Sequence, residues 1–175
     1  MKAVKLESER LVFLPLSLKH LSQEYLNWLN DFEVNRYLES RQGYNIKLLE
    51  NFLKEQERKD ILFWAIHIKE KNKHIGNIKI DPINLESNSG EYGILIGDKS
   101  SWGKGYAKEA SSRIINYCFK VLQLSKITLG VVSENKKAIK LYENLGFKRE
   151  RIVKKIGVYD GKECDSIRMI KNNYE

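Results

Sequence analysis

The chain has 175 residues, of which 42% are hydrophobic and 31% are charged, as in folded globular domains rather than disordered chains. This length predicts a single domain over residues 1–175. No run approaches the ~18–20 apolar residues of a membrane span, and no apolar leader follows Met1, so we expect no membrane partner and a cytoplasmic location.

The formal net charge of +8 favours anionic partners, such as a phosphorylated cofactor, a nucleotide-linked substrate or nucleic acid. The basic residues are scattered and form no known nucleic-acid-binding motif, which argues against nucleic acid. The two cysteines form no C-x-x-C unit, so we expect two reduced thiols. The three histidines lack zinc-ligand spacing, and we expect no metal.

The first half of the chain predicts two helices among several strands. Apolar residues at helical spacing follow Ser17 and again follow Asn45, so each of these polar residues is expected to cap a helix. Apolar runs predict strands at residues 10–14, 61–68, 74–81 and 91–97, the third of which ends at Pro82.

The second half begins with a glycine-rich turn at residues 98–107, followed by a long helix and a core strand at 126–132. Another helix starts at Ser133 or Glu134 and stops at Gly146, and it turns Ala138, Leu141/Tyr142 and Leu145 inward. Strands at 147–158 and 164–170 are joined at a hairpin signal, residues 160–161. The alternating elements predict a mixed α/β domain around one sheet.

The glycine-rich turn has the properties of an anion site. Gly103 and Gly105 lack side chains, so the backbone can approach a ligand closely. The first N–H groups of the following helix have no intrahelical partner, and together they can hold a phosphate or diphosphate. The turn matches neither a Walker A motif nor a dinucleotide fingerprint, and taken alone it is also compatible with a plain strand-to-helix connection.

Two motifs resemble the GNAT superfamily of acetyl-CoA-dependent N-acetyltransferases. Residues 102–110 (WGKGYAKEA) are similar to its diphosphate loop, R/Q-x-x-G-x-G/A, which Gly105 and Ala107 match. Trp102 stands where Arg or Gln is usual, as in the branch that acetylates ribosomal-protein N-termini. Residues 135–147 (NKKAIKLYENLGF) resemble its second cofactor motif, N-x-x-A-x-x-x-Y-x-x-x-G-F, and the whole likeness spans residues 8–172.

The resemblance implies acetyl-CoA as cosubstrate and a mixed, mostly antiparallel sheet of about seven strands, splayed at its centre and flanked by about four helices. The pantetheine arm would pair with the strand of Ile94, Leu95 and Ile96, and a bulge near Leu95 would offer an N–H to the thioester oxyanion. Asn135 would bind the cofactor arm, or would simply start a helix. The diphosphate would be held by Trp102, Gly103, Lys104, Gly105, Tyr106 and Ala107.

Acetyl transfer to an amine needs a proton donor for the departing thiolate and a proton acceptor for the amine. Tyr142 corresponds to the family's general acid, although a core tyrosine is the alternative. Some relatives carry a glutamate base where this chain has Gly130, so Glu91 is the predicted substitute, and a solvated strand-end carboxylate is its alternative. His67 and Glu39 are weaker candidates for the base.

The acceptor pocket is expected at residues 28–41, which mix aromatic and charged side chains. This run resembles acetyltransferases of amino sugars, including nucleotide-linked ones. A polyamine, an aminoglycoside, a protein N-terminus and a non-enzymatic acyl-CoA or nucleic-acid binding module stay open, as does a homodimer. The predicted acceptor-binding residues are Trp28, Asp31, Arg36, Tyr37 and Glu39.

Overall fold

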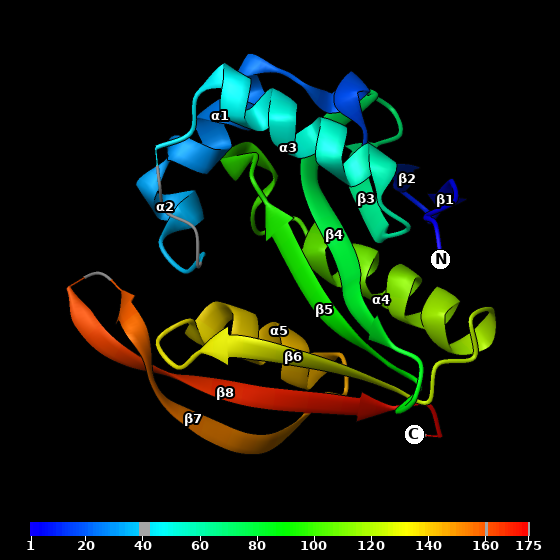
Figure 1. Ribbon diagram of the computed structural model, residues 1–175, viewed down its shortest axis with the longest axis vertical. Coiled ribbons are helices and arrows are strands. Elements are labelled where there is room, and N and C mark those ends of the chain that lie inside the picture. The colour runs from blue at the N-terminus through cyan, green and yellow to red at the C-terminus, as the bar shows by residue number, and fades with distance from the viewer. Residues whose placement is uncertain (39–42, 160, 175) are drawn as a thin grey trace. The chain divides into compact units, whose positions relative to one another are not determined.

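The computed structural model describes residues 1–38, 43–159 and 161–174. Their strands form one eight-stranded sheet in the order β1-β2-β3-β4-β5-β6-β8-β7 (Figure 1). The strands are β1 (Leu6–Glu7), β2 (Leu11–Pro15), β3 (Leu62–Ile68), β4 (Lys73–Asn84), β5 (Ser89–Ile96), β6 (Lys126–Val132), β7 (Lys148–Tyr159) and β8 (Lys162–Asn172). The helices are α1 (Gln23–Asn30), α2 (Phe32–Asn35), α3 (Ile46–Arg58), α4 (Tyr106–Lys120) and α5 (Lys136–Asn144), with 3-10 turns at Leu18–His20 and Lys99–Ser101.

This architecture confirms the predicted mixed, mostly antiparallel sheet. The strand beyond the expected seven is the two-residue β1, and the helix beyond the expected four is the single-turn α2. The chain divides into two compact units, one of Met1–Asp81 with Gly93–Arg113 and the other of Pro82–Tyr92 with Ile114–Glu175. The single-domain prediction stays a prediction.

The first unit contains a core in which α1 and α3 lie side by side over β3 (Figure 1). Leu49 and Leu53 of α3 and Ala65 of β3 are completely buried there. Asn45 caps α3 as predicted, since its side chain accepts a hydrogen bond from the backbone N–H of Leu48.

The predicted start of the first helix is wrong. Ser17 begins only a 3-10 turn, because the ring of His20 accepts a hydrogen bond from the Ser17 N–H at 3.1 Å and Leu21 is extended. Helix α1 starts after Ser22, whose hydroxyl accepts from the Tyr25 N–H at 3.1 Å. A short side-chain-to-backbone contact thus displaces the helix start by five residues.

In the second unit, β5 and β6 are parallel and pair Ser89–Glu91 with Lys126–Thr128. Strand β6 pairs along its whole length with β8, which forms a long hairpin with β7 (Figure 1). Gly146 follows α5 with φ +85°, as a helix stop requires.

The start of α5 and the end of β4 differ from prediction. Helix α5 begins at Lys136, because Asn135 rather than Ser133 or Glu134 caps it. Its buried residues are Ile139 and Tyr142, whereas Ala138 and Leu145 are half-buried. Strand β4 continues past Pro82, since the β3 ladder already ends at Ile80 and requires no N–H beyond it.

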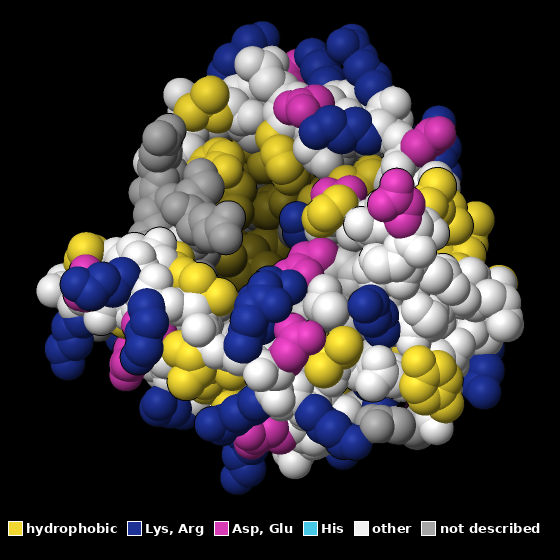
Figure 2. Space-filling model, turned by 60° about the horizontal axis from the view of Figure 1, so that its bottom comes forward, with side chains coloured by type: hydrophobic (Ala, Val, Ile, Leu, Met, Phe, Trp, Pro, Cys, Tyr) yellow, Lys and Arg dark blue, Asp and Glu magenta, His cyan; other side chains and the backbone are white. Residues whose placement is uncertain are grey.

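Among the described residues, no helix is long and apolar enough to cross a membrane, and no cluster of three His, Cys, Asp or Glu is placed to hold a metal. Both cysteines are buried free thiols, as predicted. Figure 2 shows Lys and Arg side chains dispersed among acidic and uncharged ones over the visible face, rather than gathered into one basic patch.

Candidate active site

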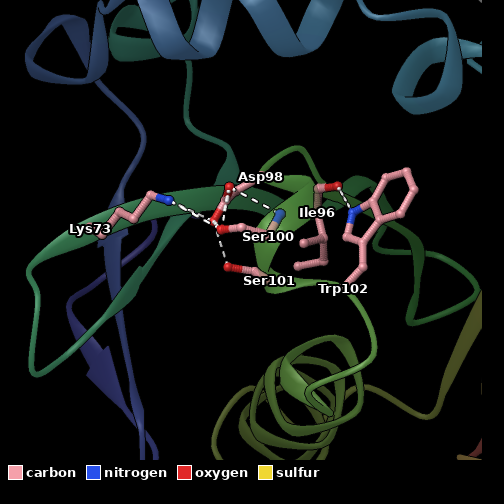
Figure 3. Close-up of polar contacts among 6 residues, drawn as sticks. All are labelled: Lys73, Ile96, Asp98, Ser100, Ser101 and Trp102. Carbon is pink, nitrogen blue, oxygen red and sulfur yellow. Dashed lines mark hydrogen bonds and ion pairs between the residues drawn. The ribbon is translucent and has the colours of Figure 1, made fainter.

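The segment between β5 and α4 is fixed by Asp98, which the sequence analysis did not single out. Its carboxylate accepts hydrogen bonds from the Ser101 hydroxyl at 2.6 Å and from Lys73 Nζ of β4 at 2.8 Å (Figure 3). Burial alone would raise its pKa, but hydrogen bonds from Lys73, Ser101 and Ser100 lower the pKa of Asp98 to about 2. The carboxylate therefore stays ionised and fixes residues 98–101, which lead into the glycine turn.

Trp102 attaches the same segment to β5. Its Nε1 donates to the carbonyl of Ile96 at 2.8 Å (Figure 3). The backbone of Ile94, Leu95 and Ile96 was expected to pair with the pantetheine arm, and of these groups the Ile96 carbonyl already has a partner. The N–H groups of Gly97 and Asp98 both donate to the Ile75 carbonyl, at 2.9 and 3.1 Å, so the irregularity found in the structure follows β5. The bulge predicted near Leu95 stays a prediction.

The glycine turn, residues 103–107, has an open backbone. Gly103 and Gly105 adopt φ +74° and +81°, a region that glycine occupies without strain. A Cβ on Gly103 would meet nothing within 4 Å, and one on Gly105 would meet only Arg10 Nη2, at 3.4 Å.

The N–H groups of residues 103–108 donate to no acceptor within the part of the chain that the structure describes. The last of these residues form the first turn of α4, a helix of 15 residues. Unpaired donors, glycine-lined space and a helix N-terminus together fit a diphosphate. The turn therefore has the open backbone that the sequence predicted, and diphosphate binding there stays a prediction.

Asn135 lies in the second unit and caps α5. Its Oδ1 accepts from the Ala138 N–H at 3.2 Å, which agrees with the helix-start interpretation. Its amide nitrogen donates to no residue that the structure describes, so that side of the group can still bind a ligand. A contact with the cofactor arm stays a prediction.

Tyr142 is buried on the inner face of α5, at 8% exposure. Its ring meets Tyr92 and Phe147 edge-on, with centroids 5.7 and 6.0 Å apart. Burial raises the pKa of Tyr142 to about 12, and its hydroxyl bonds to none of the described residues. The phenol therefore keeps its proton and has a hydroxyl donor that no described residue uses, whereas a buried core tyrosine usually bonds its hydroxyl to a neighbour.

Glu91 is not the solvated strand-end carboxylate of the alternative interpretation. Both its oxygens accept from Arg168, at 2.7 Å each, and Oε2 also accepts from the Thr128 hydroxyl at 2.6 Å. The pair is bidentate and partly buried. Arg168 lies opposite Gly130 in the β6–β8 ladder, and a Cβ at position 130 would be 3.0 Å from its Nη1. Gly130 thus leaves room for the guanidinium that Glu91 binds.

The predicted acceptor residues fall on α1, α2 and the residues after them. Trp28 is buried against Gly97, whose Cβ position lies 2.3 Å from the indole, so only glycine fits there. Asp31 caps α2 and, with Glu33, binds Lys99 Nζ at 2.6 and 2.8 Å. This ion pair lowers the pKa of Asp31. These contacts place two carboxylates around one ammonium group.

The other predicted acceptor residues are Arg36, Tyr37 and Glu39. The guanidinium of Arg36 lies 5.0 Å from the Tyr37 ring centroid, a cation–π contact. Glu39 lies outside the described residues.

His67, the weaker candidate for the base, belongs to a three-histidine cluster in the first unit. It stacks on His74 at 5.1 Å, and His20 meets both rings edge-on at 5.4 and 5.3 Å. Burial lowers the pKa of all three, that of His74 to about 3. The cluster is accordingly neutral at physiological pH and forms part of the packing.

A family model described as an acetyltransferase (GNAT) domain matches residues 10–148, and the chain belongs to this family. An N-acetyltransferase 9-like protein of Caenorhabditis briggsae is 29% identical over 159 residues, 83% of this chain and 78% of that protein. A spermidine N(1)-acetyltransferase of Vibrio cholerae is 41% identical over 76 residues, 43% of each chain.

Solved structures agree with the fold. Spermidine N-acetyltransferase from Vibrio cholerae in complex with CoA and spermine has a TM-score of 0.85 at 26% identity and covers 95% of this chain and 98% of its own. Ribosomal-protein-S5-alanine acetyltransferase from Vibrio fischeri has a TM-score of 0.76 at 22% identity over 97% of both chains. The fold is that of a GNAT enzyme, and the protein is an acetyl-CoA-dependent N-acetyltransferase.

Proposed function

We propose that this enzyme acetylates a small-molecule primary amine by direct transfer, with the cofactor diphosphate bound at the glycine turn. The observation that carries the proposal is the set of N–H groups over residues 103–108 that have no acceptor among the described residues, next to Gly103 and Gly105 at positive φ. A diphosphate would accept several charge-assisted hydrogen bonds there, and the dipole of α4 would add to its binding.

Bound acetyl-CoA supplies the acetyl group as a thioester. In direct transfer, the amine forms a C–N bond at the carbonyl carbon, the C–S bond breaks, the amine loses a proton and the thiolate gains one. We assign the proton donor to Tyr142, because its phenol is protonated and its hydroxyl has no partner among the described residues. Asn135 and the backbone of Ile94, Leu95 and Ile96 are proposed to hold the cofactor arm.

The amine proton needs a separate acceptor. Glu91 remains the proposed base, acting through water, since both its oxygens already accept from Arg168. A carboxylate so paired is a weaker base than a solvated one. We therefore expect the rate to rise with pH, because a larger fraction of the acceptor in solution is then the unprotonated amine, which needs no base.

We favour an aliphatic polyamine as the acceptor. Asp31 and Glu33 share the ammonium of Lys99, and a polyamine ammonium would bind these two carboxylates by displacing Lys99. The similarity to spermidine acetyltransferases supports the same class. The likeness of residues 28–41 to amino-sugar acetyltransferases supports amino sugars as the second class, which includes nucleotide-linked amino sugars.

An acceptor screen tests the proposal. Thiol release from acetyl-CoA would be followed with spermidine, spermine, glucosamine, a nucleotide-linked amino sugar, an aminoglycoside and a peptide with N-terminal alanine. We expect turnover with spermidine and spermine. Asp31→Asn should raise KM for spermidine several-fold, whereas Asp60→Asn, which removes an exposed ion pair with Lys2, should not.

The screen also separates the alternatives. Turnover with an amino sugar alone would replace the polyamine assignment. Release of no thiol with any amine would leave a non-enzymatic acyl-CoA module, and tight, steeply salt-dependent binding to duplex DNA would point to nucleic acid. We also propose a homodimer and a cytoplasmic location, and sedimentation analysis would test the first.

A further inference from the structure

Arg10, in the turn between β1 and β2, contacts the glycine turn directly. Its Nη1 donates to the carbonyl of Lys104 at 3.0 Å, and its guanidinium carbon lies 4.6 Å from the ring centroid of Tyr106. Arg10 therefore touches the residue between the two glycines and also the first residue of α4.

The guanidinium is itself held by Glu109, in the first turn of α4. Arg10 Nε donates to Oε2 at 2.7 Å, while the Arg10 backbone N–H and the Ser8 hydroxyl donate to Oε1 at 2.8 and 2.7 Å. Because Glu109 compensates the charge of Arg10 at contact distance, Arg10 adds little net positive field to the turn. Its contribution is geometric.

That geometry determines where one N–H group points. The peptide unit that joins Lys104 to Gly105 is planar, and in a trans peptide the C=O and N–H bonds point in opposite directions. A hydrogen bond that fixes the Lys104 carbonyl therefore also fixes the Gly105 N–H. This peptide unit turns about ψ of Lys104 and φ of Gly105, and because Gly105 has no side chain the unit has unusual freedom to rotate unless something outside the turn holds it.

We propose that Arg10 is a positioning residue that holds the Lys104–Gly105 peptide in the orientation presenting the Gly105 N–H to the cofactor diphosphate. The inference rests on the proposed function, since it requires the diphosphate to bind at the glycine turn. Arg10 acts through the backbone of the turn and touches neither the reacting thioester nor the amine.

Steady-state kinetics of Arg10→Met with two acetyl donors test this role. Acetyl-CoA carries the diphosphate and S-acetylpantetheine lacks it. We expect KM for acetyl-CoA to rise about tenfold or more with kcat nearly unchanged, and kcat/KM for S-acetylpantetheine to stay at the wild-type value.

Arg113→Met is the matched control. Arg113 Nε donates at 2.7 Å to the carbonyl of Glu7, so it also joins α4 to β1, but it has no contact with the carbonyl of Lys104. This variant should leave both donors unaffected. Arg10→Lys keeps the charge beside Glu109 but loses the planar fork that reaches two acceptors, so it should weaken acetyl-CoA binding as Arg10→Met does. It also serves as the test if Arg10→Met does not fold.

Two results would overturn the inference. An equal loss of kcat/KM with both donors would make Arg10 merely structural, and an unchanged KM for acetyl-CoA would leave it without a role. Gly105→Val separates this failure from that of the proposed function. If Gly105→Val binds CoA normally, the diphosphate lies elsewhere and both ideas fail; if it binds poorly while Arg10→Met binds well, only the inference about Arg10 fails.

Discussion

Replacing Gly105 by valine tests whether the glycine turn holds the cofactor. Gly105 has φ +81°, where a β-branched residue is strained by roughly 1–2 kcal/mol. The new Cβ would lie 3.4 Å from Arg10 Nη2, an ordinary contact, so we expect no larger steric penalty within the protein. The free energy of unfolding should therefore fall by about 1–2 kcal/mol and the fold should survive.

The effect on cofactor binding should be larger. A hydrogen bond from a backbone N–H to a charged acceptor contributes about 1.5–3 kcal/mol, and the valine side chain would keep a diphosphate from one or two of these donors. A loss of about 2–4 kcal/mol corresponds to a CoA affinity about 30- to 1,000-fold weaker.

Titration calorimetry with CoA and denaturant unfolding provide the two measurements. Gly161→Val is the matched control, because Gly161 has φ +72° and open space around its Cβ position but lies in the β7–β8 turn. It should lose similar stability and keep its CoA affinity. The reasoning would be refuted if Gly105→Val bound CoA within about threefold of wild type, or if both variants lost affinity equally.

Three further predictions concern the acid, the base and the histidines. Tyr142→Phe should lower kcat by about 10²-fold or more with KM for acetyl-CoA near wild type, and an equal kcat would remove its role as proton donor. Glu91→Gln should cost about 1–3 kcal/mol of stability because Arg168 loses an ionic partner; if Glu91 also acts as base, the pH–rate profile should shift, whereas a purely structural role would leave its shape unchanged. The lowered pKa of His74 means that the unfolded chain takes up a proton below about pH 6.5 while the folded protein does not until about pH 3. Stability should consequently be full above pH 6.5 and should fall by about 1–2 kcal/mol by pH 5, and urea unfolding that gave equal stabilities at pH 7.5 and 5 would contradict this.

Much of the fold could be predicted from the sequence, because it depends on residues only a few positions apart. The caps and stops at Asn45 and Gly146, the core strand at 126–132 and the two glycines of the turn all follow from local conformational preferences. The family motifs lie in the same local segments, which is why the family and its cosubstrate could be predicted. The first helix start was missed because the His20 ring accepts from the Ser17 N–H and confines the segment after Ser17 to a short 3-10 turn.

The partners of the charged residues were decided only by the tertiary structure. Glu91 meets Arg168 across 77 positions, and Arg10 meets Glu109 across 99, because strand order and register bring these side chains together. Asp98 and Lys73 are joined in the same way, from neighbouring segments of the first unit. The sequence by itself determined the glycine-rich turn with Gly103 and Gly105, the segment proposed to bind the diphosphate. Only the folded chain decided that a distant arginine, Arg10, donates to the Lys104 carbonyl of that turn and that the predicted base already carries an ionic partner, since contacts between distant residues depend on how strands and helices pack.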